Sequence, residues 1–272
     1  MTEQRTKIDG YTAYWRTAGD PRKQHLIFFN GWGARLDGFL GSHRVIAELA
    51  KYFYVVSPEL PGFMRSDPPE TVWTVEDFAH FARKVLLPLN IQNPVIMGQS
   101  FGGGIAALYA KFYGEGARCL ILVDAVLSGR RQNWYFRLRY WMPTLARLVN
   151  APFVPVFLQR CIWSAYLGVP HAVLKRRNVR DYMVMAQFQA SQHCIPDVDY
   201  RKLSMPLLLV WGDRDTWVSD MARAKQVHDE VPNSAFVVVK GPHTVLYRRP
   251  EYVINEIIGG LNRLLGHDLP AA

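Results

Sequence analysis

Short apolar runs that alternate with helix-like segments constrain the fold of this chain more than any other feature. The runs are apolar at nearly every position instead of every second one, which is typical of strands covered on both faces. A sheet of such strands is mostly parallel and carries helices on both sides, so the pattern predicts an α/β fold. The expected strands are His25–Phe29, Phe53–Leu60, Val95–Met97, Cys119–Val126, Leu207–Trp211 and Ala235–Val239.

Helical spacing fills several intervals between these runs. The best-marked helix is Val75–Leu89, where Thr74 stands at the N-cap and Asp77 follows three residues later, close to a capping box. Further helices are expected near His43–Lys51, at Phe101–Tyr113 and at Pro250–Leu265.

One segment interrupts the alternation. Residues 128–202 are aromatic and arginine-rich, have a helix-like pattern and contain no convincing strand. We therefore predict one α/β core made of residues 1–127 and 203–272, into which residues 128–202 are inserted as a helical cap.

Bulk composition narrows the class of protein. The chain has 272 residues, of which 49% are hydrophobic and 20% charged, as expected for a soluble globular protein. Its polar start lacks the apolar region of a secretory signal, and no uncharged apolar run reaches the roughly 18 residues of a membrane helix. Cys119, Cys161 and Cys194 form no C-x-x-C pair and indicate neither a zinc site nor a disulfide framework. We expect a cytoplasmic protein.

The stretch VIMGQSFGGG (95–104) sets a serine among glycines where an expected strand meets an expected helix. Its G-x-S-x-G pattern is typical of a nucleophile elbow, a turn that strains the backbone of the serine. Strand and helix crowd together at such a turn, and Gly98 and Gly102 supply the small residues that it needs. We interpret Ser100 as a catalytic nucleophile; the alternative is a glycine-rich turn with a bystander serine.

A serine hydroxyl is a weak nucleophile that needs a histidine base, itself oriented by a buried carboxylate. His243 directly follows an expected strand, at the sheet edge where such folds place their sites, whereas the other later histidines fall in the cap, a helical stretch or the tail. For the acid, Asp215 in WGDRDTWVSD is the first choice and Asp213 is interpreted as a turn residue. Asp124, after the strand CLILV, is the second candidate.

These motifs resemble the α/β-hydrolase fold family from about Ile27 to Leu264. The elbow GQSFGG, the acid loop WGDRD and the histidine loop GPHTVLYRRP occur in the family's order, and SPELPGFMRSD resembles its D-x-P-G-x-G-x-S segment. The resemblance implies a mostly parallel central sheet with helices on both faces and an inserted helical cap. It also implies a catalytic triad of Ser100, Asp215 and His243.

The same resemblance assigns the oxyanion hole. Family members usually carry His-Gly where this chain has Asn30-Gly31, followed by a residue whose backbone N–H faces the developing oxyanion. The implied donors are the backbone N–H groups of Trp32 and Phe101. Because these donors are backbone groups, the change to Asn30 alters only the hydrogen bonds that support the loop.

Positive charge is concentrated in the expected cap. Residues 128–202 hold twelve Arg and Lys side chains against three Asp, which accounts for the whole net charge of +9. A solvated basic face, an acidic partner such as an acyl carrier protein, and an anionic lipid surface are the three interpretations. Nucleic acid is not indicated, since no binding motif accompanies the charge. The candidate partner-binding residues are Arg130, Arg131, Arg137, Arg139, Arg176 and Arg177.

The sequence therefore predicts a serine hydrolase that cleaves a carboxylic ester or thioester through an acyl-enzyme. The aromatic residues of the cap favour a substrate with an apolar acyl or aryl group. No metal or organic cofactor is implied. Acyl transfer and carbon–carbon bond hydrolysis use the same triad and stay open, as does a non-catalytic, ligand-binding relative.

Overall fold

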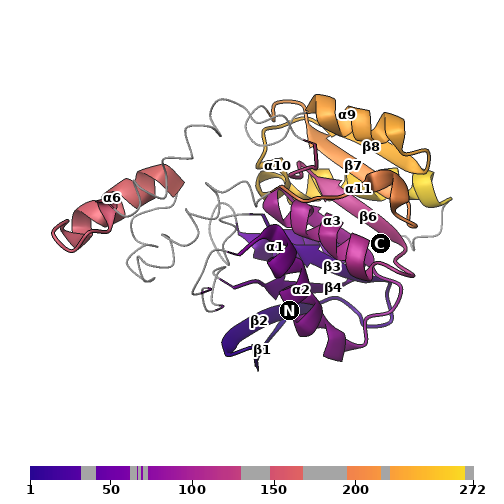
Figure 1. The fold of residues 1–272 in the computed structure, drawn as a ribbon. Helices are drawn as coiled ribbons and strands as arrows, with labels where there is room; N and C mark the ends of the chain where they lie inside the picture. The colour runs from indigo at the N-terminus through magenta and orange to yellow at the C-terminus, as the bar shows by residue number, and fades with distance from the viewer. Residues whose placement is uncertain are drawn as a thin grey trace.

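The computed structural model describes residues 1–31, 41–61, 66, 69, 73–129, 148–167, 195–215 and 221–266. Its centre is an eight-stranded sheet with the order β1-β2-β4-β3-β5-β6-β7-β8 (Figure 1). The strands are β1 (Thr2–Ile8), β2 (Tyr11–Ala18), β3 (His25–Phe29), β4 (Tyr54–Glu59), β5 (Val95–Gln99), β6 (Cys119–Val123), β7 (Leu207–Gly212) and β8 (Ser234–Val239).

The pairing of the strands confirms the predicted class. From β4 through β3, β5, β6 and β7 to β8 every neighbouring pair is parallel, whereas β1–β2 and β2–β4 are antiparallel. Parallel strands end together at one edge of a sheet, so the loops after β5, β6, β7 and β8 lie side by side. Each candidate catalytic side chain follows one of these strands.

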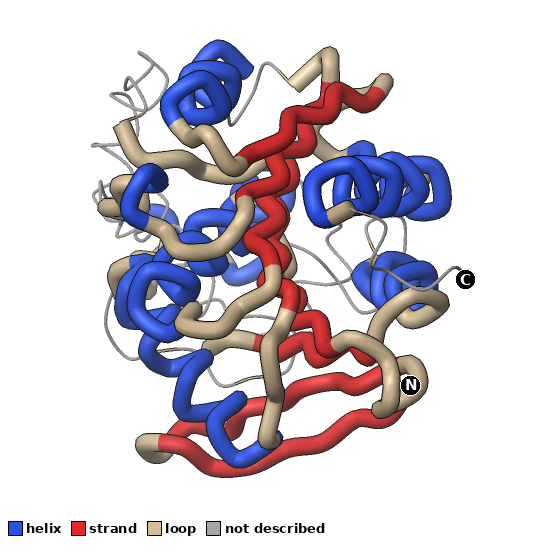
Figure 2. Tube along the Cα trace, turned by 90° about the vertical axis from the view of Figure 1, so that its right-hand side faces the viewer, coloured by secondary structure: helices blue, strands red, loops and turns tan. Residues whose placement is uncertain are grey.

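Helices cover both faces of the sheet, as Figure 2 shows on either side of the strands. Helices α2, α3 and α9 pack on one face, and α1, α10 and α11 pack on the other. Thr74 and Asp77 form the expected capping box at the start of α2. The helix bounds are α1 (Ser42–Leu49), α2 (Val75–Leu86), α3 (Phe101–Tyr113), α9 (Met221–Glu230), α10 (Val245–Arg248) and α11 (Pro250–Leu265).

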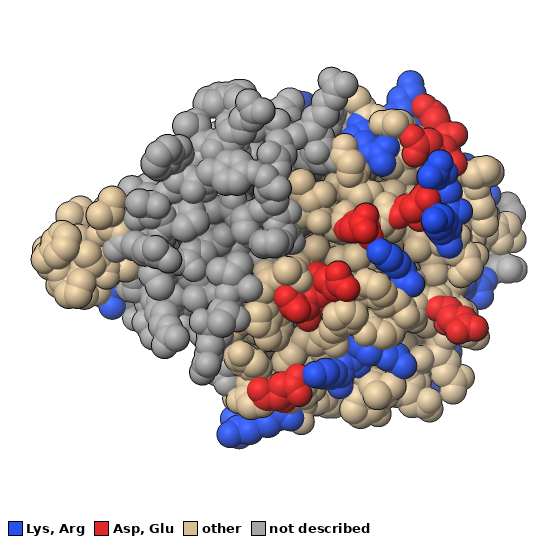
Figure 3. Space-filling view, in the orientation of Figure 1, with Lys and Arg blue, Asp and Glu red and all other residues tan. Residues whose placement is uncertain are grey.

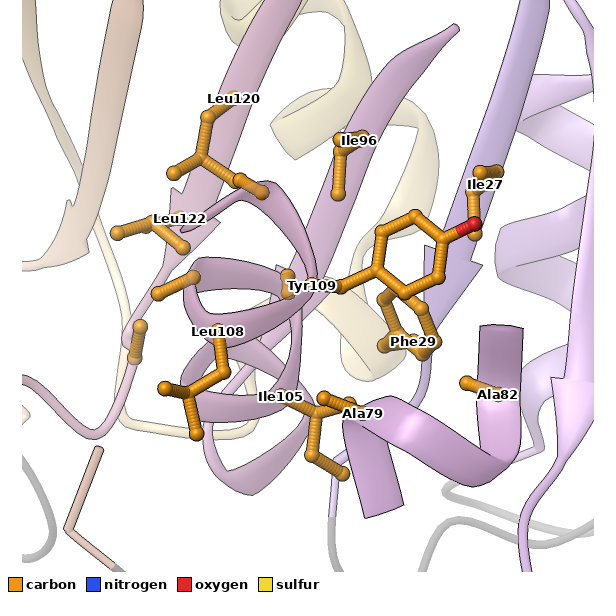
Figure 4. Close-up of a cluster of buried hydrophobic side chains, with 14 of the residues drawn as sticks. Ile27, Phe29, Ala79, Ala82, Ile96, Ile105, Leu108, Tyr109, Leu120 and Leu122 are labelled. Carbon is orange, nitrogen blue, oxygen red and sulfur yellow. The ribbon is translucent and has the colours of Figure 1, made fainter. Parts of the chain in front are cut away.

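The strands are apolar throughout because their side chains enter two cores. In β3, Ile27 and Phe29 face the cluster with α2 and α3, whereas Leu26 and Phe28 face the cluster with α1 and α11. All four are at most 1% exposed. Figure 4 shows the first cluster, where Tyr109 of α3 lies over β3. Helix α3, which begins directly after Ser100, therefore packs against the sheet.

The hairpin of β1 and β2 was not predicted from the sequence. Strand β1 reads TEQRTKI and is exposed along almost its whole length, so it lacks the apolar run by which the other strands were recognised. Its turn is Asp9-Gly10, with φ 51° and 85°. Two positive φ angles are what a two-residue hairpin turn requires, and an Asp-Gly pair is the signal that marks it in a sequence.

Most of the predicted cap lies outside the described residues, so its boundaries stay a prediction. Within 128–202, the described part holds helix α6 (Val156–Leu167) and the short 3-10 helix Tyr200–Lys202, with no strand. Helix α6 lies well away from the sheet (Figure 1). None of the described helices combines the length and apolar character needed to cross a membrane.

Candidate active site

Ser100 stands in the tight turn between β5 and α3. Its φ of 55° and ψ of −120° form a conformation that non-glycine residues rarely adopt. A Cβ atom at Gly98 would lie 2.2 Å from the carbonyl oxygen of Gly102, and one at Gly102 would lie 2.3 Å from that of Phe29. Neither position of this turn has room for a side chain, and the crowding fixes the direction of Ser100.

A chain of two hydrogen bonds joins Ser100, His243 and Asp215. The Nε2 atom of His243 lies 2.8 Å from the Ser100 hydroxyl, and its Nδ1 atom lies 2.8 Å from Oδ2 of Asp215. A carboxylate only accepts, so Nδ1 carries the proton and Nε2 accepts from the serine. The His243 side chain is 14% exposed and that of Asp215 is 0%. The imidazole is therefore positioned to take a proton from Ser100.

The two carboxylates of the WGDRD loop have different surroundings. Asp215 is buried against the imidazole, whereas the Asp213 side chain is 42% exposed. Asp213 accepts a hydrogen bond of 2.8 Å from the N–H of Gly241 and so ties the loop after β7 to the loop after β8. Its contact is that of a loop-supporting residue and not of a partner for His243.

A third carboxylate, that of Asp124, enters the site from the end of β6. It is 0% exposed, has φ 45°, and its Oδ1 atom accepts a hydrogen bond of 2.8 Å from the N–H of Gly212. Burial raises the pKa of the Asp124 carboxyl to about 8, the Gly212 N–H opposes this rise, and the charge of Asp215 adds to it. The second candidate acid thus lies beside the first, and its surroundings oppose its ionisation.

Asp124, Asp215 and His243 are also a set of metal-ligand types, with one ligand atom of each lying within 4.8 Å of the others. Both ring nitrogens of His243 are already engaged, one by Asp215 and one by Ser100. A metal ion bound there would have to displace one of these hydrogen bonds. The donor set therefore fits a proton-transfer chain better than a cation site.

Of the two implied oxyanion donors, Phe101 lies among the described residues and Trp32 does not. Phe101 is the first residue of α3, so its N–H belongs to the helix end that has no intrahelical acceptor and carries partial positive charge. Trp32 lies outside the described residues, and its role stays a prediction. The residue before it, Gly31, is described and is buried beside Gln99, whose Oε1 a Cβ atom at Gly31 would approach to 1.9 Å.

Asn30 has a supporting role of its own in place of the usual histidine. Its Nδ2 atom donates to the Ser57 hydroxyl over 2.9 Å, and that hydroxyl donates to the carbonyl oxygen of Phe28 over 3.0 Å. These bonds connect the end of β3 and the residue after it to Ser57 within β4, in the buried interior. With Asn30 in place of the usual histidine, the loop after β3 is therefore still tied to the sheet.

Two residues that sequence reasoning missed hold the loops of the site together. The N–H of Gly31 donates to the Tyr247 hydroxyl over 2.9 Å, and Nε2 of Gln99 donates to the carbonyl oxygen of His243 over 3.1 Å. Both lie inside quoted motifs, GQS and GPHTVLYRRP. A polar side chain next to a candidate nucleophile or base was the available signal, but its partner could not be read from the sequence.

The candidate partner-binding arginines, Arg130, Arg131, Arg137, Arg139, Arg176 and Arg177, all lie outside the described residues. On the described part of the face shown in Figure 3, basic and acidic side chains are interspersed. This mixture agrees with the absence of net charge outside residues 128–202.

Comparisons with known proteins agree with this architecture. The sequence model of the alpha/beta hydrolase fold matches residues 24–161, half of the chain. An uncharacterized protein of Mycobacterium tuberculosis is 26% identical over 262 residues, which cover 88% of this chain and 75% of that protein. The uncharacterized hydrolase YugF of Bacillus subtilis is 24% identical over 276 residues, which cover 93% of this chain and 96% of YugF.

Among solved structures, an alpha/beta hydrolase fold protein from Burkholderia ambifaria superimposes with a TM-score of 0.76. The match covers 94% of this chain and 97% of that one at 19% sequence identity. At this identity the likeness concerns the fold alone.

Proposed function

The chain belongs to the alpha/beta hydrolase fold family, and from this premise we propose that it is a serine hydrolase that cleaves a carboxylic ester or thioester through an acyl-enzyme. The observation that carries the proposal is the hydrogen-bonded chain from Ser100 through His243 to the buried Asp215. A nucleophile, a base and an orienting carboxylate are the three groups that this chemistry needs.

In the first step the Ser100 hydroxyl attacks the carbonyl carbon of the substrate while His243 accepts its proton at Nε2. Asp215 stabilises the resulting imidazolium through Nδ1–H. The negative charge that develops on the carbonyl oxygen is stabilised by backbone N–H groups, for which we propose Phe101 and Trp32. His243 then gives its proton to the leaving alcohol or thiol, and the acyl group stays on Ser100.

In the second step His243 removes a proton from water, the hydroxide attacks the acyl carbon, and the carboxylic acid leaves as Ser100 regains its proton. Acyl transfer would place an alcohol or thiol in the position of this water, and carbon–carbon hydrolysis would use the same three side chains. Both ring nitrogens of His243 have the contacts that acylation requires, and we propose ester or thioester hydrolysis because water is the acyl acceptor that needs no second substrate.

A fluorophosphonate probe tests the proposal, since it reacts with an activated serine and not with an ordinary one. The wild type should be labelled at Ser100 and Ser100→Ala should not be labelled. Ser204→Ala is the matched control, because Ser204 is an exposed serine before β7, at the opposite edge of the sheet. A wild type that resists the probe would point to a ligand-binding relative, and labelling of Ser100→Ala would place the nucleophile elsewhere.

A further inference from the structure

We propose that Asp124 is a positioning residue that carries a proton on Oδ2 and donates it in a hydrogen bond to Asp215, so that the two carboxyl groups behind His243 share one negative charge. The proposal rests on the function proposed above, because it concerns the orientation of that triad. It assigns a role to a buried acid that the mechanism itself leaves unused.

The backbone fixes Asp124 at the site. It follows β6 at φ 45°, a conformation that Asp and Asn tolerate better than most residues. Its Oδ1 atom is held by the N–H of Gly212, the last residue of β7. Because β6 and β7 are parallel neighbours, Asp124 at the end of β6 lies beside the loop after β7, which carries Asp215.

The second oxygen of Asp124 identifies the place of the proton. Oδ2 is fully buried, and no donor among the described residues reaches it. One ligand atom each of Asp124, Asp215 and His243 lie within 4.8 Å of one another, and the nearness of Asp215 contributes to the raised pKa of the Asp124 carboxyl. Two carboxyl groups can share a hydrogen bond only if one of them carries the proton.

Electrostatics decide which of the two carries it. Asp215 accepts Nδ1–H of His243 and must be ionised to stabilise the imidazolium, whereas Asp124 is opposed in its ionisation by burial and by the charge of Asp215. Asp215 and His243 are the titratable side chains that face Asp124 among the described residues. The proton therefore rests on Asp124, in line with the raised pKa of that carboxyl.

The proton has a consequence for the reaction. When Asp124 is protonated, Asp215 is held between two donors, Oδ2–H of Asp124 and Nδ1–H of His243. It then cannot turn away from the imidazole. Without the proton on Asp124, two buried carboxylates would repel each other and the orienting bond to His243 would loosen. Activity should therefore fall on the alkaline side of pH 8, where Asp124 loses its proton.

Asp124→Asn tests this directly, because an amide is neutral at every pH, can donate to Asp215 and can still accept from Gly212. We expect its second-order rate of fluorophosphonate labelling to stay within about threefold of wild type at pH 7, with the alkaline decline removed. Asp124→Gly tolerates φ 45° but removes both the donor to Asp215 and the acceptor for the Gly212 N–H. It should therefore lose at least the roughly tenfold to a hundredfold that one hydrogen bond to a charged group contributes. Asp213→Asn, the control, should keep the alkaline decline.

A second measurement does not depend on activity. The native state keeps a proton that the unfolded chain releases near pH 4, so the free energy of unfolding contributed by Asp124 should fall as the pH rises from about 4 to about 8. Asp124→Asn should remove this fall, as measured by denaturant titration at several pH values.

The outcomes separate this inference from the proposed function. If the wild type is labelled at Ser100 but Asp124→Asn is inactive at pH 7, or if the alkaline decline persists in that variant, Asp124 works as an ionised group and the inference is wrong. If the wild type is not labelled at all, the proposed function fails, and the unfolding measurement still decides whether Asp124 carries the proton.

Discussion

The edge of the sheet that carries Ser100, His243 and Asp215 differs from helix α6 in the kind of side chain that is buried. At the edge, Ser100 and Asp215 are polar and only 6% exposed, and each has a hydrogen-bond partner. At α6 and the turn before it, large apolar side chains face outward, with Phe153 81% and Phe157 68% exposed. Buried polar groups are stable when they are hydrogen-bonded, whereas a large exposed apolar patch is typical of an interaction surface.

The largest effect on activity is expected at Ser100, on the buried polar edge of the sheet. Ser100→Ala removes the nucleophile and should lower the turnover of a p-nitrophenyl ester by roughly 10⁴–10⁶-fold, as deletions of triad members do. Thermal unfolding should change little, because the substitution is small. Turnover near the wild-type rate would show that the buried polar edge is structural.

The second effect concerns Asp215. Asp215→Asn keeps the shape of the side chain but offers an amide to Nδ1, which favours the wrong imidazole tautomer and should slow acylation by about 10⁴-fold. Asp213→Asn should cost far less, since Asp213 contacts Gly241 and not His243. Pre-steady-state kinetics with the same ester would measure both. The reverse order of the two effects would show that the acid was wrongly assigned.

A smaller effect is expected at Tyr247 of α10, which accepts from the N–H of Gly31, the residue before the proposed oxyanion donor Trp32. Tyr247→Phe keeps the ring in the apolar core but removes the acceptor for the Gly31 N–H, and should lower kcat/KM by about two- to tenfold. Tyr200→Phe is a matched control, because its hydroxyl accepts from the N–H of Ser128, outside the triad. Equal losses of rate in the two variants would show that only stability was affected.

The smallest effect on a small ester is expected in the predicted cap, residues 128–202. We propose that its positive charge serves an acidic carrier or an anionic lipid surface that presents the substrate. Reversing Arg137, Arg139, Arg176 and Arg177 to Glu should leave hydrolysis of a short p-nitrophenyl ester within about threefold of wild type. Activity on a carrier-linked or vesicle-presented substrate should fall through the association rate, and wild-type activity on it should fall with salt, which screens charges beyond about 8–10 Å.

The exposed phenylalanines at α6 and the turn before it allow a companion variant. Phe153→Ser with Phe157→Ser removes exposed apolar surface and should leave both stability and small-ester hydrolysis nearly unchanged, since surface substitutions usually fall within about 0.5 kcal/mol. If neither this variant nor the charge reversal affects a presented substrate, and salt has no effect, the cap is a solvated surface.

Local patterns carried most of what could be predicted from the sequence. The parallel strands, the capping box at Thr74 and the turn at Ser100 depend on neighbouring residues, and His243 and Asp215 were found because they follow strands. The β1–β2 hairpin was missed because β1 has a polar sequence. The place of Asp124 beside Asp215 depends on β6 and β7 being neighbours, which a sequence does not state.

The hydrogen bond between Gly31 and Tyr247 bears on the order in which the parts of the fold come together. It joins positions 216 residues apart, and the contact between Ser100 and His243 spans 143. Closing such long loops costs more entropy than closing short ones, and we expect these contacts to form after the elbow and its neighbouring strands have folded. On the ribosome, a growing chain carries the Ser100 hydroxyl through most of its synthesis without its base. Under the proposed function, hydrolysis therefore begins only when the C-terminal part of the fold has docked.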